Sequence, residues 1–326
     1  MQRTRWAMVG TGLMLDLIGR DLLATENVDL RVLVSRTTER AESKAAAFGI
    51  PEHSADYDAV LARPDIDVVY IATPHTLHFE QAMAALEAGK HVLVEKPMTT
   101  DAPHTRELCA AAQARGLFAM EAMWTAFNPA IVELRRRLAD GVIGEVHLLQ
   151  ANFCFPAPFV ADWRLWAKDL AGGTTLDQGV YPISLAHMLF GTPTRITAHG
   201  TVMHEVDAEV ATTLDFGAGE RAICLSSLRT SAPNDAFVSG STGWVRLAAP
   251  FFATTRFVVH GAGDRTDEFT IEREGAGYVP MLRAVSAAIL DGRTEHELRT
   301  HADTVAVAET MDDVLRQVMA AGIDRG

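Results

Sequence analysis

Two short segments of the chain carry residue types that are suited to chemistry. Gly10-Thr11-Gly12 and Glu95-Lys96-Pro97 each follow directly on an apolar run. Glycines after a strand allow a tight turn and let a pyrophosphate approach the backbone, beside the positive N-terminus of the next helix. A carboxylate and an ammonium at the carboxyl end of a parallel strand lie in the crevice where such sheets bind ligands, and proline restricts the turn that follows. The alternatives are a plain glycine-rich turn and a surface ion pair, so the surrounding elements must decide.

The N-terminal part of the chain alternates short apolar strands with helices. We predict strands at 5–9, 30–34, 68–72, 91–94 and 117–120, and helices at 13–24, 39–48, 58–62, 78–88 and 104–114. This alternation is typical of βαβ units and a parallel sheet, whose strands are apolar throughout because both faces are covered. Since Gly10-Thr11-Gly12 joins the first strand to the first helix, we predict a dinucleotide-binding Rossmann domain, doubly wound, over residues 1–122.

After about Met123 the pattern changes. We predict helices at 129–139, 176–189, 278–290 and 303–320, and strands at 146–155 and in six segments between 195 and 260. Strands that follow one another, separated by turn signals such as GAGE and GSTG, favour an antiparallel sheet with one face packed on helices. Residues 123–326 are therefore expected to form a second, α/β domain that holds the substrate.

Composition narrows the function classes. A chain of 326 residues suits two domains, and 48 % hydrophobic with 22 % charged residues suits a protein with a real core. The formal net charge of −13 disfavours nucleic acid as a partner, and no apolar run approaches a membrane span. The three cysteines form neither a disulfide framework nor a CxxC zinc half-site, and the N-terminus has no apolar signal core. We expect a cytoplasmic location and a small-molecule substrate.

The end of the second predicted strand bears on the choice of cofactor. NAD sites usually place Asp or Glu there to accept the ribose 2′-hydroxyl, but this strand ends in Val34-Ser35-Arg36, with Arg40 one helical turn later. Arginine binds phosphate through two directed, charge-assisted bonds. We therefore predict a preference for NADP(H), with NAD also possible. The alternative is that both arginines are merely solvated.

Four longer motifs extend these patterns. They are VGTG at 9–12, IATPHTLHFEQAMAALEAGKHVLVEKP at 71–97, EAMWTAFNPA at 121–130 and GGTTLDQGVYPI at 172–183. On these motifs nearly the whole chain resembles the glucose–fructose oxidoreductase and inositol dehydrogenase family (Gfo/Idh/MocA). The last two motifs are most similar to the branch of dimeric dihydrodiol dehydrogenases, NADP-linked xylose dehydrogenases and glucose–fructose oxidoreductases.

The resemblance implies a fold, an activity and a set of cofactor contacts. The fold is a Rossmann domain joined to an α/β domain with a large, open, mostly antiparallel sheet, whose open face forms dimers or tetramers. The activity is NAD(P)-dependent oxidation of CH–OH, or reduction of C=O, in a sugar, polyol or related cyclic alcohol, with trans-dihydrodiols as the alternative. The implied cofactor contacts are Gly10, Thr11, Gly12, Leu13, Ser35, Arg36, Arg40, Thr73, Pro74, His75, His78, Glu95, Lys96, Trp163, Arg164 and Tyr278.

The resemblance also points to the catalytic residues. Many family members carry D-x-G-x-H, whose histidine exchanges a proton with the substrate, whereas this chain has Asp177-Gln-Gly-Val-Tyr181, as in the branch named above. A free phenol has a pKa of about 10, and a nearby ammonium lowers that pKa. We therefore predict that Tyr181 exchanges the hydroxyl proton while Lys96 orients the substrate and stabilises the phenolate. Asp177 is expected to bind a substrate hydroxyl or to position Lys96.

Other interpretations stay open at this stage. His75 and His78 form an HxxH pair, but helix-spaced metal ligands need a third partner, so we expect no metal. A cofactor-binding regulator without catalysis is disfavoured because Lys96 and Tyr181 are present, and a zinc alcohol dehydrogenase because the cysteine ligands are missing. The five aromatic residues of FCFPAPFVADWRLW, at 153–166, suit a sugar face, an apolar diol pocket or plain packing equally.

Overall fold

The computed structural model describes residues 2–263, 265–321 and 323–324. Its contacts divide the chain into two compact units, Met1–Trp124 with Arg273–Thr304, and Thr125–Glu272 with Val305–Gly326. The segment after residue 272 thus packs with the N-terminal unit for about thirty residues, although it falls in the second of the two domains expected from the sequence. The functional boundary at residue 122 stays a prediction.

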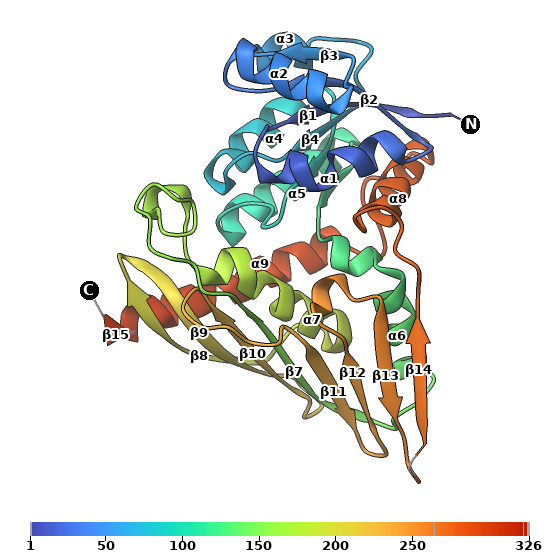
Figure 1. Ribbon diagram of the computed structural model, residues 1–326, viewed down its shortest axis with the longest axis vertical. Helices are drawn as coiled ribbons and strands as arrows, with labels where there is room; N and C mark the ends of the chain where they lie inside the picture. The colour runs from blue at the N-terminus through green and yellow to red at the C-terminus, as the bar shows by residue number, and fades with distance from the viewer. Residues whose placement is uncertain (1, 264, 322, 325–326) are drawn as a thin grey trace. The chain divides into compact units, whose positions relative to one another are not determined.

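The first unit is a parallel sheet between helices. Its sheet has the order β3-β2-β1-β4-β5-β6, and every neighbouring pair of strands is parallel (Figure 1). The direction of winding reverses between β1 and β4, so the ligand crevice of such a fold lies beyond the carboxyl ends of these two strands. The elements are β1 (Thr4–Val9), α1 (Leu13–Ala24), β2 (Val28–Val34), α2 (Thr38–Phe48), β3 (Glu52–Ser54), α3 (Tyr57–Leu61), β4 (Val68–Ile71), α4 (His78–Glu87), β5 (His91–Val94), α5 (Ala102–Arg115), β6 (Ala119–Glu121) and α8 (Val279–Leu290).

Local signals explain why these segments form helices and strands. Thr37 and Asp101 cap the N-termini of α2 and α5, and Gly49 and Gly116 end the same helices in the left-handed conformation. The four residues of β4 are all buried, as expected for a central parallel strand. The predicted Rossmann fold is confirmed, and only the short, polar edge strand β3 was missed.

The second unit is built on a nine-stranded sheet with the order β14-β13-β12-β11-β7-β10-β9-β8-β15. It is mostly antiparallel, but β7 runs parallel to β10 and β15 parallel to β8. The elements are α6 (Pro129–Ala139), β7 (Val146–Cys154), α7 (Val180–Phe190), β8 (Arg195–Met203), β9 (Val206–Asp215), β10 (Arg221–Ser227), β11 (Ala236–Gly240), β12 (Trp244–Leu247), β13 (Arg256–His260), β14 (Thr266–Thr270), α9 (His301–Ala321) and β15 (Ile323–Asp324). Helix α9 belongs to this unit from Val305 onward.

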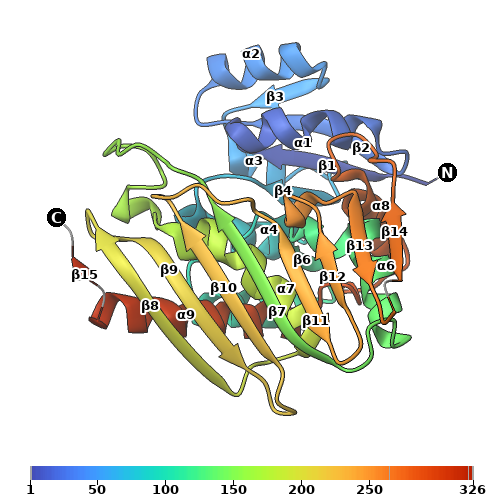
Figure 2. The same ribbon diagram turned by 60° about the horizontal axis from the view of Figure 1, so that its bottom comes forward.

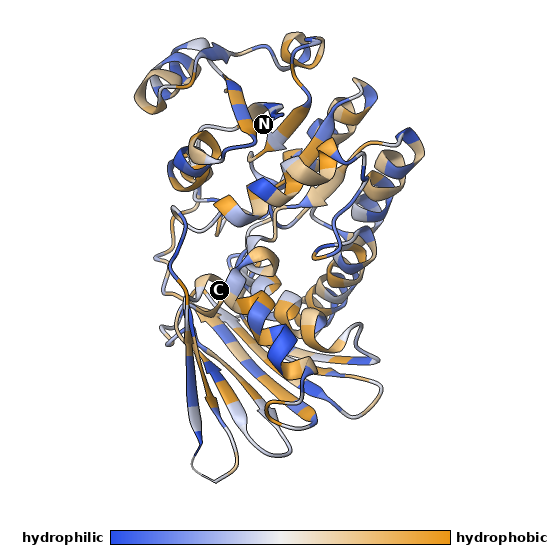
Figure 3. Ribbon diagram, turned by 90° about the vertical axis from the view of Figure 1, so that its right-hand side faces the viewer, coloured by the Kyte–Doolittle hydropathy of each residue, from blue (hydrophilic) through white to orange (hydrophobic). Residues whose placement is uncertain are grey.

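Helices cover one face of this sheet. α6 packs on β13, α7 on β7 and β10, and Gln317 of α9 accepts a hydrogen bond from the backbone of Ala198 in β8. Figure 2 shows the opposite face, on which no helix of the described part of this unit lies. The strands carry alternating bands of polar and apolar residues (Figure 3), because one face is buried and the other is not. The large open sheet that the resemblance implied is therefore confirmed.

Two details of the second unit differ from the sequence expectation. The helix predicted from residue 176 begins as a π-helix, Thr175–Gly179, before α7 starts at Val180. Strands β14 and β15 were missed: β14 has the polar sequence TDEFT, β15 has only two residues, and both lie at edges of the sheet. Over the residues that the structure describes, no helix combines the length and the apolar character needed to cross a membrane.

Candidate active site

The turn after β1 suits a pyrophosphate. Gly10 has a φ of +120°, and a Cβ at this position would overlap the carbonyl oxygen of Ala72 at the end of β4, so only glycine fits. Gly12 precedes α1 without a side-chain cap, and nothing lies within 4 Å of the position a Cβ would take. The N-terminus of α1, with Leu13 exposed beside it, is thus open to an anion.

Thr11, Ser35 and Arg40 lie together at the carboxyl end of β2. The hydroxyl oxygens of Thr11 and Ser35 are 2.9 Å apart, and Arg40 donates to the hydroxyl and the carbonyl of Thr11 at 2.8 and 3.0 Å. Arg36 is exposed next to them, and neither arginine pairs with a carboxylate among the described residues. Two uncompensated guanidiniums suit the extra phosphate that distinguishes NADP from NAD.

The turn after β4 is tied to the turn after β5 by His78. The Nε2 of His78 lies 2.9 Å from the carbonyl of Thr73, and its Nδ1 lies 3.0 Å from the carbonyl of Pro97. Burial lowers the pKa of His78 because desolvation disfavours the imidazolium. Both ring nitrogens are therefore occupied by the protein rather than directed at a metal, while Pro74 and His75 remain at least partly accessible in the same turn.

Glu95 is buried at the end of β5. Tyr70 on β4 donates to its carboxylate, which also accepts from the backbone N–H of Lys96 at 3.1 Å. Burial raises the pKa of Glu95, and the bond from Tyr70 and the charge of Lys96 offset this only in part. Lys96 itself is half-buried at the strand end, at the same edge of the sheet as Gly10.

A buried ion pair anchors the chain beyond Lys96. The N–H of Met98 donates to Glu121 at 3.0 Å, and Arg299 donates to the same carboxylate through Nε at 2.9 Å and also through its second terminal nitrogen. The side chains of Glu121 and Arg299 are each 2 % exposed. Residues far apart in the sequence thus fix the position of the Lys96 turn.

Tyr278 is held by the helix that begins at the glycine turn. Asp21 of α1 accepts from the N–H groups of Ala276 and Tyr278, each at 2.9 Å. A Cβ on Gly275 would overlap the Asp21 carboxylate. The ring of Tyr278 stacks on Trp124, with centroids 4.3 Å apart. The resemblance assigned Tyr278 to the cofactor. The structure places it beside Trp124, which belongs to the motif at 121–130 and for which the sequence predicted no role.

In the second unit, Arg164 and Asp177 form an ion pair. Arg164 Nη1 lies 2.8 Å from Asp177 Oδ1, and the Asp177 side chain is 9 % exposed. The structure therefore joins a predicted cofactor residue to a predicted catalytic one. Trp163, next to Arg164, is 37 % exposed. Asp177 belongs to the π-helix, a rare conformation that is frequent at functional sites.

Tyr181 lies in the first turn of α7 against aromatic side chains. Its ring centroid is 5.5 Å from that of Phe153 and 4.8 Å from that of Phe252, and these two phenylalanines stack at 4.4 Å. The side chain is largely buried. The environment on this side of the phenol is apolar, so it suits a flat or hydrophobic ring better than a heavily hydroxylated chain.

Each unit thus brings several predicted residues together, while others stay apart. Lys96 and Tyr181 belong to different units, so their convergence stays a prediction. Sequence reasoning missed the buried polar residues that hold the predicted ones, because each is a single residue whose partner lies far along the chain. The only local sequence signal for such buried contacts is a pair of consecutive glycines, because glycines let another group approach the backbone closely. The missed residues are Asp21, Tyr70, Glu121, Thr175, Asp207 and Arg299.

Comparisons with known proteins agree with this organisation. Residues 4–123 match the family model described as "Oxidoreductase family, NAD-binding Rossmann fold", and residues 131–246 match the GFO/IDH/MocA C-terminal domain. A trans-1,2-dihydrobenzene-1,2-diol dehydrogenase of Xenopus laevis is 31 % identical over 97 % of this chain and 98 % of its own length. The mouse (Mus musculus) enzyme of the same name is 35 % identical over 79 % of this chain and 78 % of its own length.

Solved structures are similar over almost the whole chain. A 3-ketoreductase from Actinomadura kijaniata, in complex with NADP and TDP-benzene, is 30 % identical, with a TM-score of 0.87 over 99 % of both chains. An aldose–aldose oxidoreductase from Caulobacter crescentus, complexed with glycerol, is 25 % identical, with a TM-score of 0.87 over 97 % of both chains. A levoglucosan dehydrogenase at 21 % identity, with a TM-score of 0.90 over 98 % of both chains, shares the fold.

Proposed function

Because this chain belongs to the Gfo/Idh/MocA oxidoreductase family, we propose that it transfers a hydride between NADP(H) and a ring carbon bearing a hydroxyl or carbonyl group. It is an NAD(P)-dependent oxidoreductase of CH–OH donors, and the proposal concerns its cofactor preference, substrate class and residues. One observation carries the proposal: the glycine turn after β1 and Lys96 after β5 lie at the same edge of one parallel sheet. This edge is where doubly wound sheets bind ligands.

The protein's part in the reaction is positioning and proton transfer. The bound nicotinamide supplies the hydride chemistry. In oxidation, Lys96 donates a hydrogen bond to the substrate oxygen, and Tyr181 accepts the hydroxyl proton. In reduction, Tyr181 returns that proton to the forming alcohol. An ammonium beside a phenol stabilises the phenolate, so the two groups act as a pair. Asp177, paired with Arg164, accepts a second substrate hydroxyl and sets which carbon faces the cofactor.

For the substrate we favour a cyclic trans-diol. Phe153 and Phe252 beside Tyr181 provide an apolar surface for a ring, while Asp177 provides an acceptor for a second hydroxyl. The relatives named as dihydrodiol dehydrogenases support this choice, and sugars are the second class because one similar structure is that of an aldose–aldose oxidoreductase. The test is NADPH absorbance with trans-dihydrodiols, aldoses and inositols. Turnover of the dihydrodiol with a higher kcat/KM than any aldose is expected, and cofactor binding without turnover on any substrate would contradict an enzymatic role.

The preference for NADP rests on Arg36 and Arg40. We expect the ratio of kcat/KM for NADP to that for NAD to exceed about 10, and to fall at least tenfold in the double variant Arg36→Ala, Arg40→Ala. Arg115→Ala, an exposed arginine at the end of α5, is the matched control and should leave the ratio unchanged. A wild-type preference for NAD that is lost on changing Glu39 would overturn the assignment.

The open sheet face is proposed to pair with a second copy of the chain. Its outward side chains include exposed Ile223 and Trp244, and Trp244 stacks on His260 at 3.9 Å. Exposed apolar groups that cluster on one face mark association surfaces. Light scattering should give a dimer or tetramer, and Ile223→Asp with Trp244→Asp should give the monomer. A monomeric wild type at micromolar concentration would refute this. The cytoplasmic location stays a prediction.

A further inference from the structure

Asp207 is a buried carboxylate to which the proposed reaction gives no part. It lies at the start of β9, after a turn whose residues His204 and Glu205 are both left-handed, with φ of 49° and 64°. Its Oδ2 accepts from the N–H and from the hydroxyl of Thr175, at 2.7 and 2.6 Å. A buried carboxylate is costly unless it is hydrogen-bonded, so these contacts strongly favour one arrangement of the segment that donates them.

Two glycines make this contact possible. Gly173 has a φ of +115°, and a Cβ on it would overlap the Asp207 carboxylate, so the backbone passes directly over the acid. A Cβ on Gly172 would lie 2.8 to 2.9 Å from the carbonyl oxygens of the turn that contains Arg164. The N–H groups of Gly172 and Gly173 also donate to that turn, at 3.0 and 2.9 Å. The Gly172–Thr175 segment is therefore clamped between Asp207 on one side and the Arg164 turn on the other.

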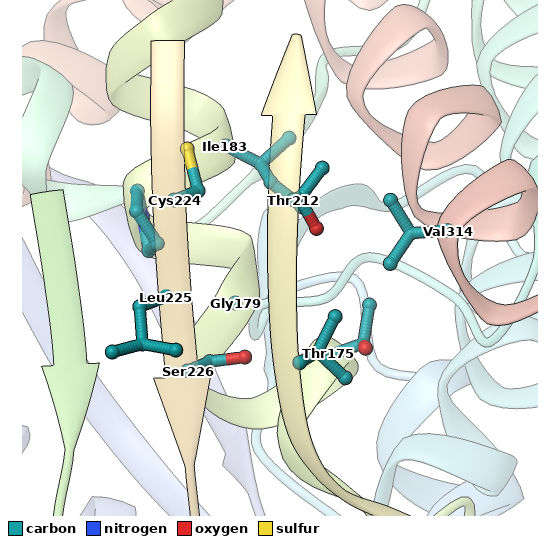
Figure 4. Close-up of a pocket in the computed structure, with 10 residues that line it drawn as sticks. Thr175, Gly179, Ile183, Thr212, Cys224, Leu225, Ser226 and Val314 are labelled. Carbon is teal, nitrogen blue, oxygen red and sulfur yellow. The ribbon is translucent and has the colours of Figure 1, made fainter. Parts of the chain in front are cut away.

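The clamped segment leads directly into the π-helix that carries Asp177. Figure 4 shows its side toward the sheet, where residues of the π-helix, β9, β10 and α9 line a cavity of only about 10 Å³, at the lower limit for a single water. The cavity is lined by Thr175, Gly179, Pro182, Ile183, Val210, Thr212, Cys224, Leu225, Ser226 and Val314. Apart from this small gap, the π-helix packs closely against the sheet, and the two hydrogen bonds to Asp207 hold its start.

In a π-helix the backbone hydrogen bonds join residues five apart, whereas in an α-helix they join residues four apart, so each hydrogen-bonded turn of a π-helix contains one more residue. If the start of the segment were released, relaxation to α-helix would rotate Asp177 by roughly 100° relative to Tyr181, the angle of one residue in an α-helix. Asp177 would then leave Arg164, whose turn is held separately by the glycines. The relative positions of the Arg164–Asp177 pair and Tyr181 therefore depend on the register that Asp207 imposes.

We infer that Asp207 is a positioning residue of the proposed active site, which transmits the rigid register of β9 through Thr175 to Asp177 and Tyr181. This inference rests on the proposed function, because Asp207 acts only through those two residues. Misplacement of reacting groups by about 1 Å can lower a rate about 100-fold, so a change at Asp207 should reduce kcat without weakening cofactor binding.

The test compares kcat, KM and the NADPH dissociation constant in substituted full-length enzymes. Rates are expressed per mole of bound NADPH, so that unfolded protein does not count. For Asp207→Asn and Thr175→Val we expect kcat to fall at least tenfold, a changed KM for the substrate, and an NADPH dissociation constant within twofold of the wild type. Thr175→Ser, which keeps both donors, should restore the wild-type values. Asp215→Asn, at the other end of β9, is the control for loss of a carboxylate from this strand.

A double-mutant cycle separates this inference from the proposed function. If Asp207 acts only through Asp177 and Tyr181, then Asp207→Asn should have little further effect on kcat in a background that carries both Asp177→Asn and Tyr181→Phe. Independent effects that multiply would overturn the positioning role while leaving Tyr181 catalytic. Near-normal turnover in Tyr181→Phe alone would instead refute the proposed function. If Asp207→Asn does not fold, Thr175→Val against Thr175→Ser decides the matter, and equal rates for those two variants would contradict the inference.

Discussion

The two halves of the proposed site are held in place by different means. Lys96 follows the end of β5, a regular parallel strand between β4 and β6, and the sheet itself carries it to the ligand edge. Tyr181 follows a π-helix whose start is fixed by Asp207. A regular strand, followed by a turn that the buried Glu121–Arg299 pair anchors, positions the first residue, whereas a single buried carboxylate fixes the segment that leads to the second. The comparison indicates that kcat is more sensitive to loss of one supporting residue in the second half of the site than in the first.

The largest expected effect concerns both halves equally. Lys96→Ala and Tyr181→Phe should each lower kcat by about 100- to 10,000-fold, because each removes a group that handles the substrate oxygen or its proton. Cofactor affinity should change far less, as measured by NADPH fluorescence titration. Lys44→Ala and Tyr57→Phe remove the same groups elsewhere in the first unit, at an exposed ion pair and a part-buried hydrogen bond to the backbone of Gln81, and kcat should stay within twofold of the wild type. Near-normal turnover in both site variants would remove them from the mechanism.

The next effect concerns stability in the Lys96 half. Glu121→Leu should destabilise the protein by about 3–5 kcal/mol in urea unfolding, since it leaves the buried charge of Arg299 without its partner. Adding Arg299→Met should recover much of this loss. Glu52→Gln removes a carboxylate from the more exposed pair with Arg63 and should cost less than about 1 kcal/mol. An equal cost for Glu121→Leu and Glu52→Gln would show that the ion pair does not anchor this half.

This difference also explains what the sequence could and could not predict. Gly10, Gly12 and Lys96 follow apolar strands directly, so periodicity alone placed them at one edge of a sheet, and the structure confirms that fold. Resemblance to a family supplied Asp177 and Tyr181. Neither source could supply Asp207 or Arg299, because their partners Thr175 and Glu121 are distant in sequence and a lone Asp or Arg carries no local pattern.

The π-helix was unpredictable for a related reason. The apolar residues from Leu176 onward predicted a helix without showing its type, and the contact of Thr175 with Asp207, at the start of the wider turn, leaves no local pattern. Likewise, the apolar alternation of the second sheet predicted its strands, whereas the polar edge strand β14 is stabilised by its pairing with β13 rather than by its own sequence. Local patterns therefore predicted the elements, and long-range polar contacts determined their irregularities.

A pH experiment tests the charge at Asp207 directly. Burial raises the pKa of Asp207 from 3.8 to about 6, and the bonds from Thr175 offset this only in part. The folded state therefore binds this proton more tightly than the unfolded state, so the wild type gains stability as the pH falls from about 6 to about 4 and loses that contribution as the pH rises. The difference in unfolding free energy between wild type and Asp207→Asn should shift by up to roughly 3 kcal/mol over this window.

The measurement is urea unfolding at several pH values between 4 and 7. Asp215 gives the opposite sign, because Arg221 and Arg195 lower its pKa, so its contribution to stability is lost rather than gained at acid pH. The same series on Asp215→Asn is therefore the control. A difference between wild type and Asp207→Asn that does not vary with pH would mean that Asp207 is not a titrating buried acid, and the contrast between the two halves would lose its physical basis.

The smallest effect gives the sharpest comparison, because it removes one hydroxyl from each half. Thr175→Val loses the hydroxyl bond to Asp207 and keeps the backbone bond. Thr99 lies three residues beyond Lys96, and Thr99→Val loses the hydroxyl bonds to Thr105 and to the carbonyl of Asp101. Each change should reduce the free energy of unfolding by about 1 kcal/mol, the net contribution of a typical hydrogen bond. Only Thr175→Val should reduce kcat, since strand β5 holds Lys96 without help from Thr99. Equal losses of kcat in the two variants would show that both halves depend on such contacts, and that the regular sheet gives Lys96 no special rigidity.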